Sequence, residues 1–245
     1  MSIFRFTLSF FFPLLFSLVF TAKAVQASEV VHMGAVIFPP SSEIDKKTNQ
    51  CVGSSIDVTK HILKQYDIEL EVTCASAIRI YKLVENGDID LTINVKSTSA
   101  LTDNVIFMQP AYGLLKIGLY ERITEKPQKV ISVIRGFGYA GFRDIYASNG
   151  FEFIDLPNSI SVLRVFERHR SDYMLAYERP VKHFVEQGLV TLGDDVKVTP
   201  LFETNNYFAI AKKSPKKELL IKVLEDYAKK NNGRMFSELA GLGLE

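Results

Sequence analysis

Residues 68–95 read IELEVTCASAIRIYKLVENGDIDLTINV, and this stretch decides the fold class. In 68–74, apolar and polar side chains alternate, which is typical of a strand with one buried face. Ser76 can cap the helix that follows, and Gly87 suits the left-handed position beyond its end. A second short strand is predicted at 91–95. The order strand, helix, strand predicts parallel pairing, with helices packed on the sheet.

The same pattern extends through the rest of the chain. Further strands are predicted at 31–38, 113–120, 130–135, 151–156, 172–177, 196–201 and 205–211. Further helices are predicted at 54–66, after the Gly136–Gly138 turn, at 159–168, around Pro180 and at 216–231. Strands and helices that alternate in this way predict an α/β protein in which mostly parallel sheets are flanked by helices.

The length fits two such lobes of about 90 to 120 residues each. If the last helix packs back on the first lobe, two strands must cross between the lobes, one leaving near Tyr120 and one returning near Leu201. We therefore expect 28–118 plus 203–245 to form the first lobe and 119–202 the second. Two crossings make a hinge, and a hinge between α/β lobes makes a cleft for a small ligand.

The first 27 residues predict an export signal. Arg5 supplies a positive charge, 6–20 form an apolar run that Pro13 interrupts, and 25–27 offer small residues around a Gln. The apolar run is shorter than the roughly 20 residues that a helix needs to span a bilayer, so a retained membrane anchor is the weaker alternative. We expect cleavage after Ala27, or else after Ala24, and a periplasmic location.

The charge of the chain is nearly balanced, with 29 Lys and Arg against 28 Asp and Glu. Removal of the leader takes away Arg5 and Lys23 but no acid, so the formal charge changes from +1 to −1. Such a chain has no overall field to attract nucleic acid, and we expect no nucleic-acid partner. The four histidines show no metal-ligand spacing and no nucleophile motif is present, so we expect no metal, no cofactor and no enzymatic activity.

The two cysteines, Cys51 and Cys74, both lie in the part predicted to be exported. Cys51 precedes the helix predicted from Ser54, and Cys74 ends a strand, so both lie at the sheet edge that helix starts and parallel-strand ends share. Disulfides persist in exported proteins. A metal or redox pair is the alternative, but such sites use closer spacing and a neighbouring His. We expect a structural disulfide.

Three segments carry a family resemblance: RIYKLVENGDID at 79–90, VKST at 95–98 and FMQPAY at 107–112. With the aromatic-proline corner at 38–40 and the closing YFAIAKK at 207–213, they resemble bacterial periplasmic solute-binding proteins of the amino-acid-binding type (family 3-like, type II fold). The resemblance covers nearly the whole chain after the leader. It implies a two-lobe, Venus-flytrap fold that closes on a solute and presents it to a membrane transporter.

The chain departs from this family at one position. Members that bind α-amino acids usually carry an Arg shortly before the Phe-x-x-Pro stretch, where it holds the ligand carboxylate. In this sequence Leu101 or its neighbour Thr102 stands there. The ordinary clamp for an α-amino acid is therefore absent at that position.

Several candidate ligand contacts lie where open α/β sheets bind ligands, at the carboxyl ends of strands. Asn94, Lys96 and Ser97 follow one strand, and Lys96 could supply a positive charge or could be an exposed loop lysine. Arg79, in the first turn of the helix after Cys74, could reach a carboxylate in the cleft or pair with a surface acid. The turn Arg135-Gly136-Phe137 leads toward a helix, whose free N–H groups favour an anion; in the alternative, Phe137 belongs to the core.

Glu178 and two aromatic residues complete the set. The position of Glu178 resembles the one from which family members offer a carboxylate to a ligand amine, whereas a salt bridge to Arg179 or Lys182 is the alternative. Phe38 and Tyr112 could stack on the solute or belong to the core.

The leading functional hypothesis is a monomeric periplasmic binding protein that captures a small polar solute, anionic or zwitterionic, for an ABC-type permease. One alternative is a ligand-sensing partner of a membrane receptor, which needs no different pocket. Another is an enzyme on the same scaffold, similar to periplasmic dehydratases, in which Glu178 would be the general acid or base.

Overall fold

A computed structural model describes residues 28–241. The export signal predicted in residues 1–27 lies outside the described residues. Between residues 28 and 241, no helix has both the length and the apolar character that crossing a bilayer requires.

Nine strands form one continuous, strongly twisted sheet in the order β4-β1-β5-β11-β7-β10-β8-β9, with β6 paired to β11. Pairing is parallel toward both ends of the sheet and antiparallel around β7 and β11. The strands are β1 (Glu29–Val36), β4 (Ile68–Ala75), β5 (Leu91–Val95), β6 (Val105–Phe107), β7 (Gly113–Arg122), β8 (Val130–Ile134), β9 (Glu152–Leu156), β10 (Tyr173–Tyr177) and β11 (Val196–Ala211).

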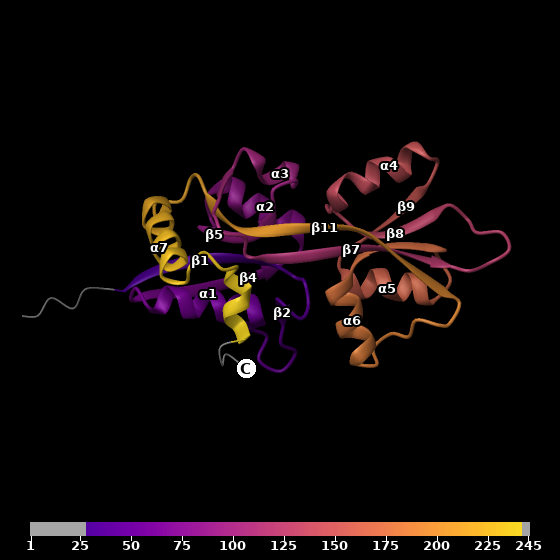
Figure 1. Cartoon of the computed structure of the whole chain (residues 1–245), viewed down its shortest axis with the longest axis horizontal. Coiled ribbons are helices and arrows are strands. Elements are labelled where there is room, and N and C mark those ends of the chain that lie inside the picture. Colours follow the sequence, from indigo (N-terminus) through magenta and orange to yellow (C-terminus); the bar gives the residue numbers. More distant parts are fainter. Residues whose placement is uncertain (1–27, 242–245) are drawn as a thin grey trace, which may run out of the picture.

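Helices cover both faces of this sheet at each end (Figure 1). The α-helices are α1 (Ser54–Lys64), α2 (Ala77–Asn86), α3 (Ser99–Thr102), α4 (Phe142–Ser148), α5 (Ser159–Glu167), α6 (Glu178–Glu186) and α7 (Lys217–Lys230). Two 3-10 helices are η1 (Tyr139–Gly141) and η2 (Phe236–Gly241). The chain therefore has the two-lobe α/β architecture that its sequence predicts.

The strands β7 and β11 connect the two lobes (Figure 1). They pair antiparallel from Gly113 opposite Asn206 to Arg122 opposite Val196, which confirms the two predicted crossings. The predicted break between the last two strands is wrong, because β11 is a single strand with a register shift near Pro200. Proline lacks the N–H that the ladder needs, so the strand bulges there and then continues. The exact lobe boundaries stay a prediction, since both fall inside these strands.

The unit β4-α2-β5 matches its sequence closely. Helix α2 ends at Gly87, whose φ of 90° is the left-handed conformation that favours glycine. Ser76 occupies the N-cap position but makes no side-chain cap hydrogen bond, contrary to its predicted role. The helix packs its buried Ile80 close against β1, because a Cβ at Gly34 would lie only 2.9 Å from Ile80 Cγ2.

Each lobe has its own apolar core on both faces of the sheet. In the first lobe, α1 and α7 enclose Ile62, Phe208 and Leu224 on one face, while α2 covers the other. In the second lobe, α5 and α6 pack Phe166 and Phe184 on one face, and aromatic residues around η1 and α4 fill the other. Each lobe is therefore stabilised by a core of its own.

The carboxylate of Asp90 connects the segment just before α7 to the first lobe through hydrogen bonds. Asp90 is 4% exposed and accepts hydrogen bonds from the backbone N–H of His32 (2.9 Å), Ser214 Oγ (2.6 Å) and Lys216 Nζ (3.2 Å). Burial alone raises the pKa of Asp90, but these three donors outweigh it and hold the pKa below its usual value. One side chain thus joins β1, the start of β5 and the segment that leads into α7.

The polar segment after β1 forms a small hairpin that the sequence did not predict, with strands β2 (Glu43–Ile44) and β3 (Cys51–Val52). The predicted disulfide is present: Cys51 in β3 is bonded to Cys74 in β4, and their Cα atoms are 5.7 Å apart. The bond closes a loop of 23 residues and fixes the hairpin to the sheet.

Candidate functional site

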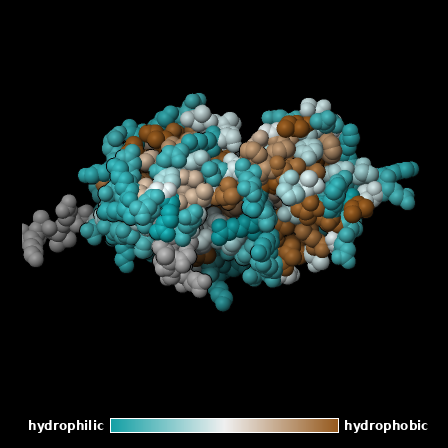
Figure 2. Space-filling view, in the orientation of Figure 1, coloured by the Kyte–Doolittle hydropathy of each residue, from teal (hydrophilic) through white to brown (hydrophobic). Residues whose placement is uncertain are grey.

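A cavity of about 120 Å³ lies where the two lobes meet. One water molecule needs about 10 to 15 Å³ by the same measure, so the cavity has room for a small solute. Its walls come from β1, β5, α2 and the start of β7 in the first lobe and from 137–139, Tyr177 and Arg179 in the second. The space-filling view shows a notch between the lobes at the upper edge of this face (Figure 2). A solute in the cavity would contact both lobes at once.

The corner after β1 forms one wall. The strand ends at Val36, two residues earlier than predicted, because Phe38 forms a backbone bridge with Ser42 instead of continuing the ladder. Ser42 Oγ donates to the Val36 carbonyl (2.6 Å), and Ser55 Oγ at the start of α1 donates to the Ser41 carbonyl (2.6 Å). These bonds and the nearby disulfide fix the corner that presents Phe38 to the cavity.

A hydrogen-bonded group from α2 and β5 forms a second wall. Asn94 Nδ2 donates to the Tyr81 hydroxyl (3.2 Å), while Asn94 Oδ1 accepts from Thr98 Oγ1 (2.7 Å). All three residues line the cavity. Because the Tyr81 oxygen accepts this bond, its own proton remains available to a ligand.

The second lobe contributes an aromatic cluster. The ring of Tyr177, at the end of β10, stacks on Tyr139 with centroids 5.5 Å apart and meets Phe137 edge-on at 5.8 Å. Phe38 from the first lobe joins them, 5.2 Å from Tyr177 and 6.5 Å from Phe137. The Tyr139 hydroxyl accepts the backbone N–H of Ile134 (2.8 Å). Aromatic rings from both lobes thus contact each other beside the cavity.

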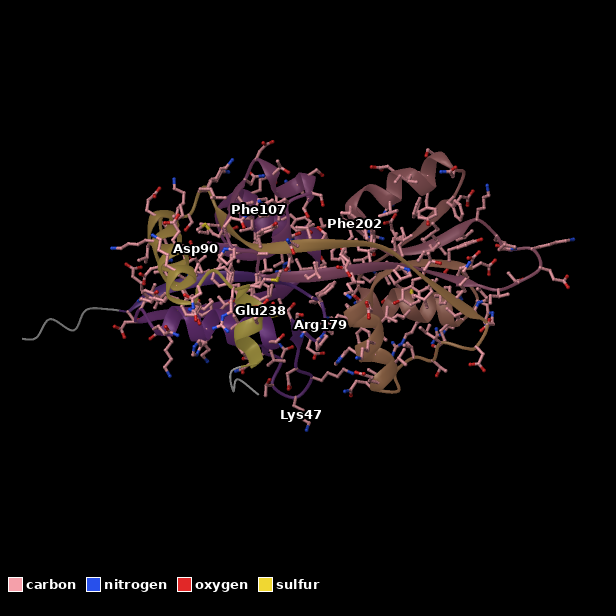
Figure 3. The ribbon with its side chains drawn as sticks, in the orientation of Figure 1. Lys47, Asp90, Phe107, Arg179, Phe202 and Glu238 are labelled. Carbon is pink, nitrogen blue, oxygen red and sulfur yellow. A yellow bond between two sulfur atoms is a disulfide. The ribbon has the colours of Figure 1, made fainter. Side chains whose placement is uncertain are left out.

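Arg179 is the charged residue of the lining, and our sequence analysis missed this role. It is exposed at the second position of α6, on the side that faces the first lobe (Figure 3). Among residues 28–241, no carboxylate forms a salt bridge with it. Its charge acts on Tyr112 across the cleft, where it opposes the rise in pKa that burial causes. A guanidinium in this position can hold an anionic group.

The four tyrosines of the lining are buried. Burial raises the pKa of Tyr81, Tyr112, Tyr139 and Tyr177, and in each case desolvation is the largest cause. Their hydroxyls therefore remain protonated at neutral pH and act as hydrogen-bond donors as well as acceptors.

Five of the ten predicted ligand contacts line the cavity: Phe38, Asn94, Ser97, Tyr112 and Phe137. Tyr112 is at the same time a core residue, 6% exposed and 5.1 Å from the ring of Phe208. Tyr112 therefore belongs to the core and also borders the cavity. Ligand contact by these five residues stays a prediction.

The other five predicted contacts, Arg79, Lys96, Arg135, Gly136 and Glu178, are not among the lining residues. Arg79 is exposed on α2, and Lys96 lies over the ring of Tyr207, 4.4 Å from its centroid. Arg135 donates to the Asp155 carbonyl (3.2 Å), and Gly136 lies against Ile78 of the first lobe. Their contact with a ligand stays a prediction, but it requires a different arrangement of side chains from this one.

Glu178 is the first residue of α6 and directly follows β10, which ends at Tyr177 as the sequence predicts. Successive residues of a helix point about 100° apart, so Glu178 and Arg179 face different directions. The residue that borders the cavity is consequently the basic one.

Leu101 occupies the position at which the resemblance implies an arginine. Its side chain is fully buried, 0% exposed, and packs in the core between α2 and the sheet. Leu101 is not among the lining residues, so the cation of this cavity comes from the opposite lobe.

No family model matches the sequence, and no curated protein sequence matches it. Solved structures do match. The substrate binding protein of an amino acid ABC transporter is 17% identical with a TM-score of 0.67, and the match covers 86% of this chain and 97% of that one. A histidine kinase sensor domain with similarity to periplasmic binding proteins is 16% identical with a TM-score of 0.68, covering 87% and 96%. An ancestral amino acid-binding protein, AncCDT-1, a precursor of cyclohexadienyl dehydratase, is 16% identical with a TM-score of 0.68, covering 88% and 96%.

These likenesses define the class of fold. The chain has the two-lobe type II periplasmic-binding fold over nearly all of its described length. Proteins with this fold include transport components, a receptor domain and a precursor of an enzyme, so the fold by itself leaves the function of this chain to its own site.

Proposed function

We propose that this protein is a monomeric periplasmic solute-binding protein that captures a small anionic or zwitterionic solute between its lobes. One observation carries the proposal: a cavity is lined by both lobes and is bordered by an arginine without a carboxylate partner among the described residues. Ligand pockets are commonly concave, largely apolar sites with a few well-placed polar groups. This cavity is concave and combines aromatic and aliphatic side chains with a comparable share of polar groups.

Binding is a better interpretation of the site than catalysis. The lining residues include no His, Cys, Asp, Glu or Lys, the side chains that usually transfer protons near neutral pH. The hydroxyls of Tyr112 and Tyr177 have pKa values raised further by burial, which makes them poor acid–base groups. The position of Glu178 outside the lining gives the dehydratase-like alternative no support.

The proposal is tested by thermal unfolding of the purified protein against a library of amino acids, polyamines and organic acids. A ligand at 100 times its dissociation constant stabilises the native state by about 2.7 kcal/mol, which raises the melting temperature by several degrees. We expect at least one acidic solute to do so. If no compound in the library shifts the melting temperature, the proposal is contradicted.

A pair of variants tests the role of the arginine. Hydrogen bonds to charged groups contribute about 1.5 to 3 kcal/mol, so Arg179→Gln should weaken binding of the hit about 10- to 100-fold. Lys182→Gln is the matched control, because Lys182 lies one turn later on α6, is exposed, and is not among the lining residues. Equal affinities for the two variants would remove Arg179 from the site.

We propose an ABC-type permease as the membrane partner, with a receptor as the alternative. The amino acid ABC transporter component among the similar structures supports the first, and the histidine kinase sensor domain supports the second. Cells that lack the protein should lose uptake of the radiolabelled hit. Unchanged uptake would favour the receptor.

A further inference from the structure

The charged side chains that line the cavity are of one sign only, which is positive. Arg179 is the one charged member of the lining, and no carboxylate accompanies it there. Asp57, whose charge raises the pKa of Tyr112, is exposed on α1 and is not among the lining residues. An ammonium group enclosed at this place would lose its hydration without gaining an ionic partner, which strongly disfavours its burial.

The hydrogen-bonding groups of the lining also favour an anionic ligand group over an ammonium group. Four tyrosines line the cavity, and each is at most 8% exposed. The oxygens of Tyr81 and Tyr139 accept bonds from the Asn94 amide and the Ile134 N–H, which leaves their own protons free to turn toward a ligand. The hydroxyls of Tyr112 and Tyr177 make no hydrogen bond within these residues, and neither oxygen is among the fully enclosed unpaired atoms.

Buried polar groups in folded proteins are almost always hydrogen-bonded, so these four donors call for acceptors from a ligand. The unpaired acceptor of the lining, Asn206 Oδ1, has practically no accessible surface and does not offer a ligand an equivalent contact. The lining thus offers an anion tyrosine O–H donors and a guanidinium, beside serine and threonine hydroxyls, which can donate or accept. Such a set suits a carboxylate, which has only acceptors.

The shape of the apolar wall restricts the rest of the ligand. Phe38, Phe137 and Tyr177 contact one another across the cleft through rings inclined at 31° to 79°. Val36, Ile93 and Leu115 add aliphatic lining from the first lobe. Aromatic walls favour flat apolar groups, which pack against them face-on or edge-on.

We propose that the cavity selects a small monocarboxylate with a planar, unsaturated body and no ammonium group. This inference rests on the proposed solute-binding function and narrows it, because it excludes the zwitterionic α-amino acids. The carboxylate lies against Arg179 and the tyrosine hydroxyls, and the planar body lies in the cavity against the aromatic cluster of Phe38, Phe137 and Tyr177.

Isothermal titration calorimetry on the purified protein at pH 7 tests the inference with three probes that share a phenyl ring on a two-carbon chain. They are 3-phenylpropanoate, which has the carboxylate alone, L-phenylalanine, which has carboxylate and ammonium, and 2-phenylethylamine, which has the ammonium alone. We expect 3-phenylpropanoate to bind at least tenfold more tightly than L-phenylalanine, and 2-phenylethylamine not to bind. Equal or tighter binding of L-phenylalanine, or any binding of the amine, overturns the inference.

The result separates this inference from the proposed function. If none of the three probes binds while the metabolite library yields a ligand that carries an ammonium group or lacks a planar carboxylate, the inference fails and the binding function stands. If neither the probes nor the library gives a ligand, both fail. A library hit that is a planar carboxylate without an ammonium group supports both.

Two variants test the placement of the carboxylate. Tyr177→Phe removes one hydroxyl donor and should weaken binding of 3-phenylpropanoate about fivefold or more. Tyr120→Phe is the matched control, because Tyr120 is also a buried tyrosine of the second lobe but is not among the lining residues; its affinity should equal that of the unmodified protein. Circular dichroism melting confirms that both variants fold. Unchanged affinity in Tyr177→Phe would overturn the assignment of its hydroxyl.

Discussion

Replacement of Asp90 by Asn tests how the end of the chain is attached to the first lobe. The buried carboxylate accepts three hydrogen bonds, from the His32 N–H, Ser214 and Lys216. An asparagine in the same place keeps the shape: its oxygen can accept from His32 and Lys216, and its amide can donate to the Ser214 oxygen. The substitution therefore removes the charge and little else.

The expected loss follows from that difference. A hydrogen bond to a charged group contributes about 1.5 to 3 kcal/mol and a neutral one about 0.5 to 1.5 kcal/mol, so each bond loses about 1 kcal/mol. We expect Asp90→Asn to lower the free energy of unfolding by about 2 to 3 kcal/mol at pH 7. Urea unfolding followed by circular dichroism measures this loss, since the chain has no tryptophan.

The pH dependence gives the same prediction a second test. The pKa of Asp90 is lower in the folded protein than its ordinary value of 3.8. Its stabilising effect is therefore complete well above pH 3.8 and is lost as the pH falls through the folded-state pKa. The difference between Asp90→Asn and the unmodified protein should be the same at pH 7 and pH 5 and smaller at pH 3.

Asp88→Asn is the control, because Asp88 is exposed two residues earlier in the same turn and makes no salt bridge within residues 28–241. It should change the free energy of unfolding by less than about 0.5 kcal/mol. An Asp90→Asn protein as stable as the unmodified one at pH 7, or a difference that does not shrink in acid, would refute the reasoning.

Three further predictions concern other parts of the molecule. Cys51→Ser removes the bond to Cys74 and should lower the free energy of unfolding by about 3 kcal/mol, with no further loss when dithiothreitol is added. Gly87→Ala places a side chain at a φ of 90° and should lower that free energy by about 1 kcal/mol in urea unfolding; a neutral result would contradict the left-handed helix end. Phe38→Ala removes two ring contacts across the cleft and should raise the dissociation constant of the ligand about tenfold, with a larger radius of gyration in X-ray scattering; unchanged values would contradict a role in closure.

The fold was predictable wherever local sequence and tertiary packing agree. The segment around α2 and β5 has strong alternation, a helical stripe and a glycine at a left-handed position, and the structure confirms these elements. The disulfide was predictable because sheet topology brings Cys51 and Cys74 to the same edge. The continuity of β11 was not, because Pro200 reads locally as a break and the strand is held across it by pairing with β7, a contact distant in sequence.

The residues of the site were only partly predictable, because their orientation also depends on the exact ends of strands and helices. The rule that ligands bind at the carboxyl ends of strands pointed to Asn94, Ser97 and Phe137, which line the cavity. It could not say which of two adjacent side chains faces the cavity at the start of α6, because that depends on where the strand stops and the helix begins. A cationic residue in the first turn of a helix after a buried strand was the available signal for Arg179.

A crystal structure of the protein with the solute found by thermal screening tests the central claim most directly. The proposal predicts electron density in the cavity between the lobes, with an anionic group of the solute about 3 Å from the Arg179 guanidinium. A solute bound outside this cavity, or one whose anionic group lies against Lys96 or Arg79 while Arg179 remains in solvent, would contradict it.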